Sequence, residues 1–110
     1  MVCRLILAGG IGGRVMENER DLQDYLLRKA KFNGVYARKM QAVGHTGFPD
    51  VMMAIDGRVV FIELKNPNGN GVLSQKQYHE IGRMLDAGLP VMVMHTKEEV
   101  DALIVDIVDA

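Results

Sequence analysis

Residues 59–65 read VVFIELK, an apolar run that ends in an acid and a base with one leucine between them. Side chains alternate between the two faces of a β-strand, so Glu63 and Lys65 point the same way. Read alone, the two charges form an ordinary ion pair at a strand end, which contributes little to stability. The segment that precedes this strand gives the pair a second interpretation.

Residues 50–56, DVMMAID, are predicted to form a strand that pairs with this one. Asp56-Gly57 is a typical hairpin turn, and RVVFIELK at 58–65 returns as the next strand. A turn at these two residues places Asp50 roughly opposite Glu63, at the end of the hairpin far from the turn. Two carboxylates directly opposite each other repel. A divalent cation bound by their oxygen atoms would offset that repulsion.

The rest of the sequence predicts helices on both sides of this hairpin. Gly34 ends the first helix, and Ser74 with Gln77 has the spacing of a capping box that starts the second. Thr96 with Glu99 repeats that spacing before the last helix. The predicted elements are a helix at 17–33, strands at 35–43, 50–56 and 58–65, a helix from 74 to 88, a strand at 90–95, and a helix that ends near 109.

The predicted order is therefore α-β-β-β-α-β-α. The first three strands form a meander, and the helix between the third and fourth makes a crossover, which predicts that these two strands are parallel. The fold class is α/β, with a mixed four-stranded sheet flanked by helices. A chain of 110 residues, 48% of them hydrophobic, suits one domain with a single core.

The N-terminal segment is set apart from this domain. Residues 1–15 contain a short apolar run interrupted by Arg4 and two glycines, which is a poor match to a signal peptide. A conventional helix start follows Met16, so we expect an extension at 1–15 and one domain at 16–110. Cys3 is the only cysteine and no apolar run is long enough to span a membrane, which favours a cytoplasmic location.

The charged strand end resembles a known motif. Gly-Phe-Pro-Asp at 47–50, twelve residues, and Glu-Leu-Lys at 63–65 resemble the motif of the PD-(D/E)XK nucleases. Ser74 and Gln77, with Leu73 just before them, and the earlier E-x-x-L-Q at 19–23 are similar to the VRR-NUC subfamily. The resemblance covers residues 17 to about 105 and implies a restriction-endonuclease-like core, as in short stand-alone nucleases of phages.

By this resemblance, the protein is a metal-dependent DNA endonuclease. Asp50 and Glu63 would bind Mg²⁺ or Mn²⁺ with the backbone carbonyl of Leu64, and Glu19 would reach in from the first helix. Lys65 would orient or help to deprotonate the attacking water. A bound metal lowers the pKa of its water and neutralises negative charge that develops on the phosphate.

Two of these residues also have plain structural interpretations. Glu19 stands on the face of Leu22 and Leu26, which is the buried side of the helix, but an acid at a helix N-terminus is favourable in itself. Gln77 would line the site, yet a capping box alone also explains a glutamine at that position.

The net charge of −1 hides a local basic run. No acid occurs between Arg28 and His45. Within that run, Arg38, Lys39 and Lys31 are expected to meet DNA phosphates, together with Ser74. The resemblance further implies a homodimer that acts on four-way junctions or flaps. Part of its contact is expected on strand 35–43 or on the last helix, which carries the apolar residues Val100, Leu103, Ile104 and Ile107.

Two other functions remain open at this point. The segment LILAGGIGGRV at 5–15 resembles the phosphate loop of sugar nucleotidyltransferases, but only over about ten residues and in a chain too short for such an enzyme. The second is a DNA-binding module with a nuclease-like fold and no catalysis. The complete set of Asp50, Glu63 and Lys65 argues against it.

Overall fold

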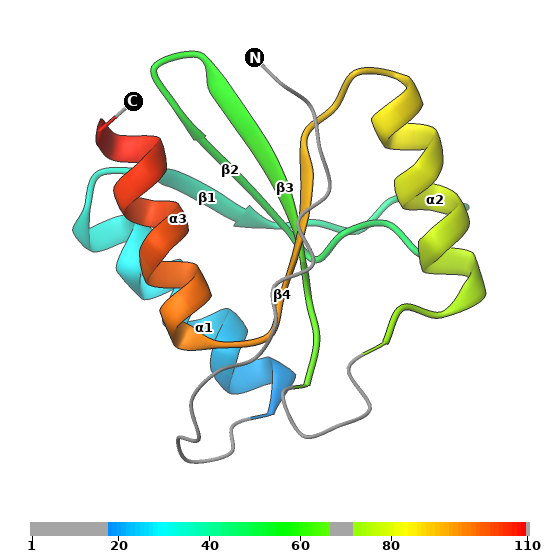
Figure 1. Cartoon of the computed structure of the whole chain (residues 1–110), viewed down its shortest axis with the longest axis horizontal. Coiled ribbons are helices and arrows are strands. Elements are labelled where there is room, and N and C mark those ends of the chain that lie inside the picture. Colours follow the sequence, from blue (N-terminus) through cyan, green and yellow to red (C-terminus); the bar gives the residue numbers. More distant parts are fainter. Residues whose placement is uncertain (1–17, 67–71, 110) are drawn as a thin grey trace.

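A four-stranded sheet with the strand order β1-β2-β3-β4 forms the centre of the protein (Figure 1). The computed structural model describes residues 18–66 and 72–109, so the predicted extension at 1–15 and its glycine-rich loop lie outside the described residues. The elements are α1 (Glu19–Phe32), β1 (Tyr36–Lys39), β2 (Val51–Ile55), β3 (Arg58–Leu64), α2 (Gln75–Asp86), β4 (Val91–Met94) and α3 (Lys97–Asp109). This order confirms the predicted α-β-β-β-α-β-α architecture.

The sheet is mixed, as the crossover between the third and fourth strands predicts. β1, β2 and β3 pair antiparallel, and β3 pairs parallel with β4. Asp56 (φ 50°) and Gly57 (φ 80°) both adopt positive φ, the backbone that a two-residue hairpin turn requires. Because this turn sets the register, Val51 lies opposite Ile62 and the next pair outward joins Asp50 to Glu63.

Helices cover both faces of the sheet: α1 and α3 lie on one face and α2 on the other (Figure 1). The Tyr25 hydroxyl donates a 2.6 Å hydrogen bond to Asp101 Oδ1, which joins α1 to α3. This bond, with a smaller effect of burial, raises the pKa of Tyr25 to about 12. Each face of the sheet has its own hydrophobic core, and alternate side chains of β3 belong to one or the other. Ile62 packs toward α1 and α3, and Phe61 packs toward α2.

The helices begin where the capping patterns predict. Ser74 and Gln77 form both halves of a capping box at the start of α2. The Thr96 hydroxyl accepts the Glu99 N–H at 3.1 Å, and the Glu99 carboxylate accepts the Thr96 N–H at 3.0 Å. α1 starts two residues later than predicted because Asn18 caps it. Among the described helices, none is long and apolar enough to cross a membrane.

Two expectations require correction. The strand predicted at 35–43 is only four residues long, because β1 ends at Lys39, opposite the first residue of β2. Met40 makes one further backbone hydrogen bond, from its N–H to the carbonyl of Asp50. The four apolar residues of the last helix add no surface beyond the core, since all four are buried against the sheet. The large apolar side chains of α3 that are exposed are instead Val105 and Val108.

The loop between β1 and β2 is held against α2 at Gly47. Its φ is +90°, and a Cβ atom built on it would lie 2.6 Å from the carbonyl oxygen of Lys76. The next two residues strengthen the attachment. Phe48 makes an edge-to-face contact with Phe61, with 5.8 Å between the ring centres, and Pro49 is fully buried. The loop therefore holds Asp50 at the end of the sheet, beside the first turn of α2.

We expect Gly47→Ala to destabilise the protein more than Gly44→Ala. Both glycines have positive φ, so each alanine costs about 1–2 kcal/mol of backbone strain. A Cβ at Gly44 meets no atom within 4 Å, whereas one at Gly47 meets backbone and adds about 1–3 kcal/mol of overpacking. Urea unfolding of both variants measures the difference, and equal losses would contradict the close approach described here.

Candidate active site

Asp50 and Glu63 meet at the end of the β2–β3 hairpin, as the register predicts. Asp50 lies just before β2, and its Oδ2 accepts the backbone N–H of Leu64 at 2.9 Å. Glu63 is the next-to-last residue of β3 and is only 1% exposed. Its side chain points to the α2 face of the sheet, opposite to its buried neighbours Ile62 and Leu64. The hairpin thus brings two carboxyl groups together at a buried strand end.

Glu63 is held in an environment that disfavours its charge. Burial is the largest cause, and the neighbouring charge of Asp50 is the next, so that the pKa of Glu63 rises to about 8. Lys65 partly offsets these effects, with its Nζ 3.7 Å from Glu63 Oε2. Glu63 Oε1 is buried and accepts no hydrogen bond. A buried carboxylate oxygen without a donor is a position where a cation would be stabilised.

Gln77 serves both the helix cap and the carboxyl pair. Its Oε1 accepts the Ser74 N–H at 2.8 Å, which closes the capping box. Because the amide oxygen is used there, the amide nitrogen must point the other way, and Nε2 donates to Glu63 Oε2 at 2.6 Å. The two interpretations of Gln77 therefore hold at once: the cap fixes the orientation in which the side chain meets Glu63.

Glu19 is exposed, although its spacing to Leu22 and Leu26 predicts a place on the buried side of the helix. Leu22 and Leu26 are buried, but Glu19, in the first turn of α1, is exposed because the helix has passed the end of the core there. Its charge still contributes to raising the pKa of Glu63. The carbonyl ligand predicted at Leu64 stays a prediction, since the observed contact of that residue with Asp50 is through its N–H.

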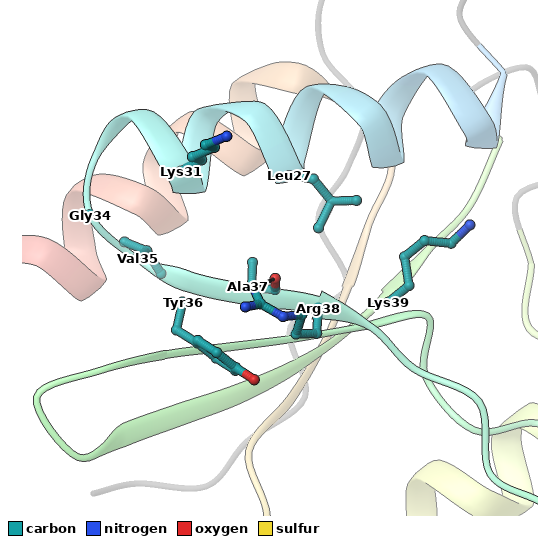
Figure 2. Close-up of a pocket in the computed structure, with 8 residues that line it drawn as sticks. All are labelled: Leu27, Lys31, Gly34, Val35, Tyr36, Ala37, Arg38 and Lys39. Atoms are coloured by element: carbon teal, nitrogen blue, oxygen red, sulfur yellow. Dashed lines mark hydrogen bonds between the residues drawn. The ribbon is translucent and has the colours of Figure 1, made fainter.

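Three of the four residues predicted to contact DNA line one groove, between α1 and β1. The groove has a volume of about 930 Å³ and contains Lys31, Arg38 and Lys39 (Figure 2). The Arg38 guanidinium stacks 4.2 Å from the ring centre of Tyr36. Ser74 lies apart from this groove, at the cap of α2, where its hydroxyl accepts the Gln77 N–H.

The sequence gives no sign of two features that shape the site. The contact of Gly47 with Lys76 and the contact of Phe48 with Phe61 join residues far apart in the chain. A glycine beside Phe-Pro is a turn signal, but nothing in that pattern says which helix the turn meets. These contacts place the loop, and through it Asp50, against the helix that carries Gln77.

The fold of this chain is similar to that of a solved protein domain. A solved structure described as a VRR_NUC domain superposes with a TM-score of 0.70 and 29% sequence identity, over 78% of this chain and 92% of that one. The chain has a VRR-NUC fold. No family model and no curated protein sequence matches it. The similarity supports a nuclease-family domain.

The carboxyl pair of Asp50 and Glu63 suits a sparsely liganded cation. Within residues 18–66 and 72–109, no group of three or more His, Cys, Asp or Glu side chains is close enough to hold a metal ion. Mg²⁺, however, is commonly bound by one or two carboxylates and takes its remaining ligands from water and phosphate. The carboxyl groups of Asp50 and Glu63 match that donor set, and Glu63 Oε1 has no hydrogen-bond partner within the protein.

We expect the stability of the metal-free protein to fall as the pH rises from about 4.5 to about 8. In that window the folded chain keeps a proton on Glu63, whose pKa is about 8, while the unfolded chain has released it at the ordinary value of 4.5. The free energy of unfolding therefore falls between these two pKa values and levels off above the raised one. Urea unfolding in EDTA measures this change.

Glu63→Gln is the matched control for this pH dependence. It keeps the size and polarity of the side chain and removes the titrating group, so its stability should vary less over the same window. Identical pH profiles for the variant and the wild type would show that Glu63 does not titrate as described.

Proposed function

We propose that the protein is a metal-dependent endonuclease that hydrolyses phosphodiester bonds of DNA in the cytoplasm. The observation that carries the proposal is the buried Glu63 carboxyl group beside Asp50. Lys65 Nζ lies 3.7 Å from Oε2 of that group. An isolated pair of carboxyl groups at a buried strand end costs stability. A function that uses their oxygen atoms explains why they stand there, and the VRR-NUC fold supports a nuclease function.

Asp50 and Glu63 would hold Mg²⁺ or Mn²⁺, with the Leu64 carbonyl as a further ligand and Glu19 nearby, directly or through water. When bound, the metal supplies Lewis-acid chemistry and an acidified water at neutral pH. Cation binding would also replace the proton that the raised pKa keeps on Glu63, since carboxylate ligands bind metals in their charged form.

The protein's own side chains would do the positioning. Lys65 is a cation on a flexible stem beside the carboxyl pair, placed to orient the attacking water and to face charge on the scissile phosphate. Gln77 holds one oxygen of Glu63 and leaves the other open. The cap on α2 fixes that hydrogen bond, so the carboxylate would keep its direction when a substrate enters.

The groove of Lys31, Arg38 and Lys39 would bind the DNA backbone. Lys39 pairs with Val51 and the next residue, Met40, donates its N–H to the Asp50 carbonyl. The basic strand β1 thus leads directly to the carboxyl pair. Phosphate contacts of this kind position DNA without reading its sequence.

Pure protein incubated with linear, flapped and four-way DNA should cut it with Mg²⁺ or Mn²⁺ and not in EDTA. Asp50→Asn and Lys65→Ala should each lower the rate by about a hundredfold or more, because each removes a group at the reacting phosphate. Asp86→Asn, at the exposed end of α2, is the control and should cut at the wild-type rate. Unchanged cleavage by Asp50→Asn would show that the site is wrong, and no cleavage with either metal would favour a DNA-binding module without catalysis.

We propose further that the protein acts as a homodimer, which would supply two active sites for a four-way junction or flap. The exposed valines of α3, Val105 and Val108, are 56% and 38% exposed and offer an apolar face on the outside of the molecule. The outer edge of β1, which pairs only with β2 within the described chain, offers a second surface.

Light scattering should give a mass of twice the 12.2 kDa chain at micromolar concentration. Val105→Glu would place a charge in the contact and should yield the monomer. Val72→Glu makes the same change at an exposed loop position before α2, outside both surfaces, and should leave the dimer intact. A wild-type monomer at high micromolar concentration would rule out paired cleavage.

A further inference from the structure

A second groove lies on the opposite side of the sheet from α1, between the loop that follows β1 and the outer side of α2. Its volume is about 630 Å³. Side chains of the loop and of the helix line it, among them His45, Thr46, Lys76, His79, Glu80 and Arg83. We call it the loop–α2 groove.

Two features of the sequence build this groove. On α2, Lys76, His79 and Arg83 are spaced by three and then four residues, so they form one stripe along the helix. The close approach of Gly47 to the backbone of Lys76 holds the loop against the start of that stripe. The packed contact at Gly47 therefore holds the two walls of the groove in place.

The charge of the groove favours an anion. Lys76 and Arg83 form no salt bridge with any residue of the described chain, and both side chains are exposed. Glu80 is the single acid in the lining, against two permanent cations and two imidazoles. Unpaired cations gathered along a concave surface raise the local concentration of anions.

The groove also leads to the carboxyl pair. Gln77 follows Lys76 directly and donates to Glu63, so one turn of α2 carries both the start of the basic stripe and the contact with the site. From Lys76 to Arg83 the helix rises about 10 Å. That length spans about three phosphates of one DNA strand, which are spaced about 3.4 Å apart along the axis.

We propose that the loop–α2 groove binds the phosphate backbone of duplex DNA beside the scissile bond, an inference that rests on the nuclease function proposed above. The groove on α1 and β1 and the loop–α2 groove then flank the carboxyl pair from two sides. Lys76 and Arg83 each contact a phosphate, and the imidazoles of His45 and His79 line the space between them.

The test measures binding apart from cleavage. Affinity for a labelled duplex is measured by fluorescence anisotropy in EDTA at several salt concentrations, for the wild type, Lys76→Ala, Arg83→Ala and the double variant. Each single change should weaken binding and flatten the slope of log K against log salt by about one, and the double variant by about two. Alanine is a good helix former at these exposed positions, so the variants should stay folded, as circular dichroism will check.

Arg28→Ala removes one exposed cation from α1, outside both grooves, and should leave the affinity and the slope unchanged. Lys76→Arg keeps the charge and should retain the wild-type slope. A double variant with the wild-type slope, or the same loss in Arg28→Ala, would overturn the proposal.

Cleavage assays of the same proteins separate this proposal from the function on which it rests. If the wild type cuts DNA and the double variant keeps the wild-type slope, the nuclease function stands and the groove assignment is wrong. If no protein cuts DNA but the slope flattens as expected, the groove binds DNA and the nuclease function is wrong.

Discussion

The hydrogen bond from Gln77 to Glu63 is the contact on which the arrangement of the site depends. It joins the end of β3 to the first turn of α2. It exists because the capping box uses the other end of the same amide. A local rule of helix initiation therefore sets the direction of a buried carboxyl group. The cost of burying that group is what distinguishes this strand end from an ordinary ion pair.

A second constraint acts from the other side of the carboxyl pair. Asp50 follows a buried proline, and its side chain accepts the N–H of Leu64, so its position is fixed relative to β3 by both backbone and side chain. The loop before it can reach this position only because Gly47 has no Cβ where it meets α2. Glu63 and Asp50 are thus positioned by the same helix, one through a side-chain amide and the other through a backbone approach.

Local patterns predicted most of this fold, while contacts between distant segments had to come from the structure. The Asp56-Gly57 turn fixed the register that pairs Asp50 with Glu63, because a two-residue turn leaves little freedom. The sequence predicts a longer β1 than the structure has, since a strand ends where its partner ends and the sequence does not mark that point. Glu19 lies on the expected face of α1 yet is exposed, because helical spacing says nothing about where the core stops. The loop–α2 groove could not be predicted, since it forms only where Gly47 meets the helix.

The shared use of Gln77 has a further consequence, for the dynamics of the protein. The first turn of a helix is the part that most readily frays. When the first turn of α2 opens, Gln77 leaves Glu63, and Glu63 Oε2 loses the amide donor that fixes its direction. Opening of this helix end would thus loosen the buried carboxyl group at the end of β3. A ligand that tightens this turn would act on the chemistry of the carboxyl pair without touching it.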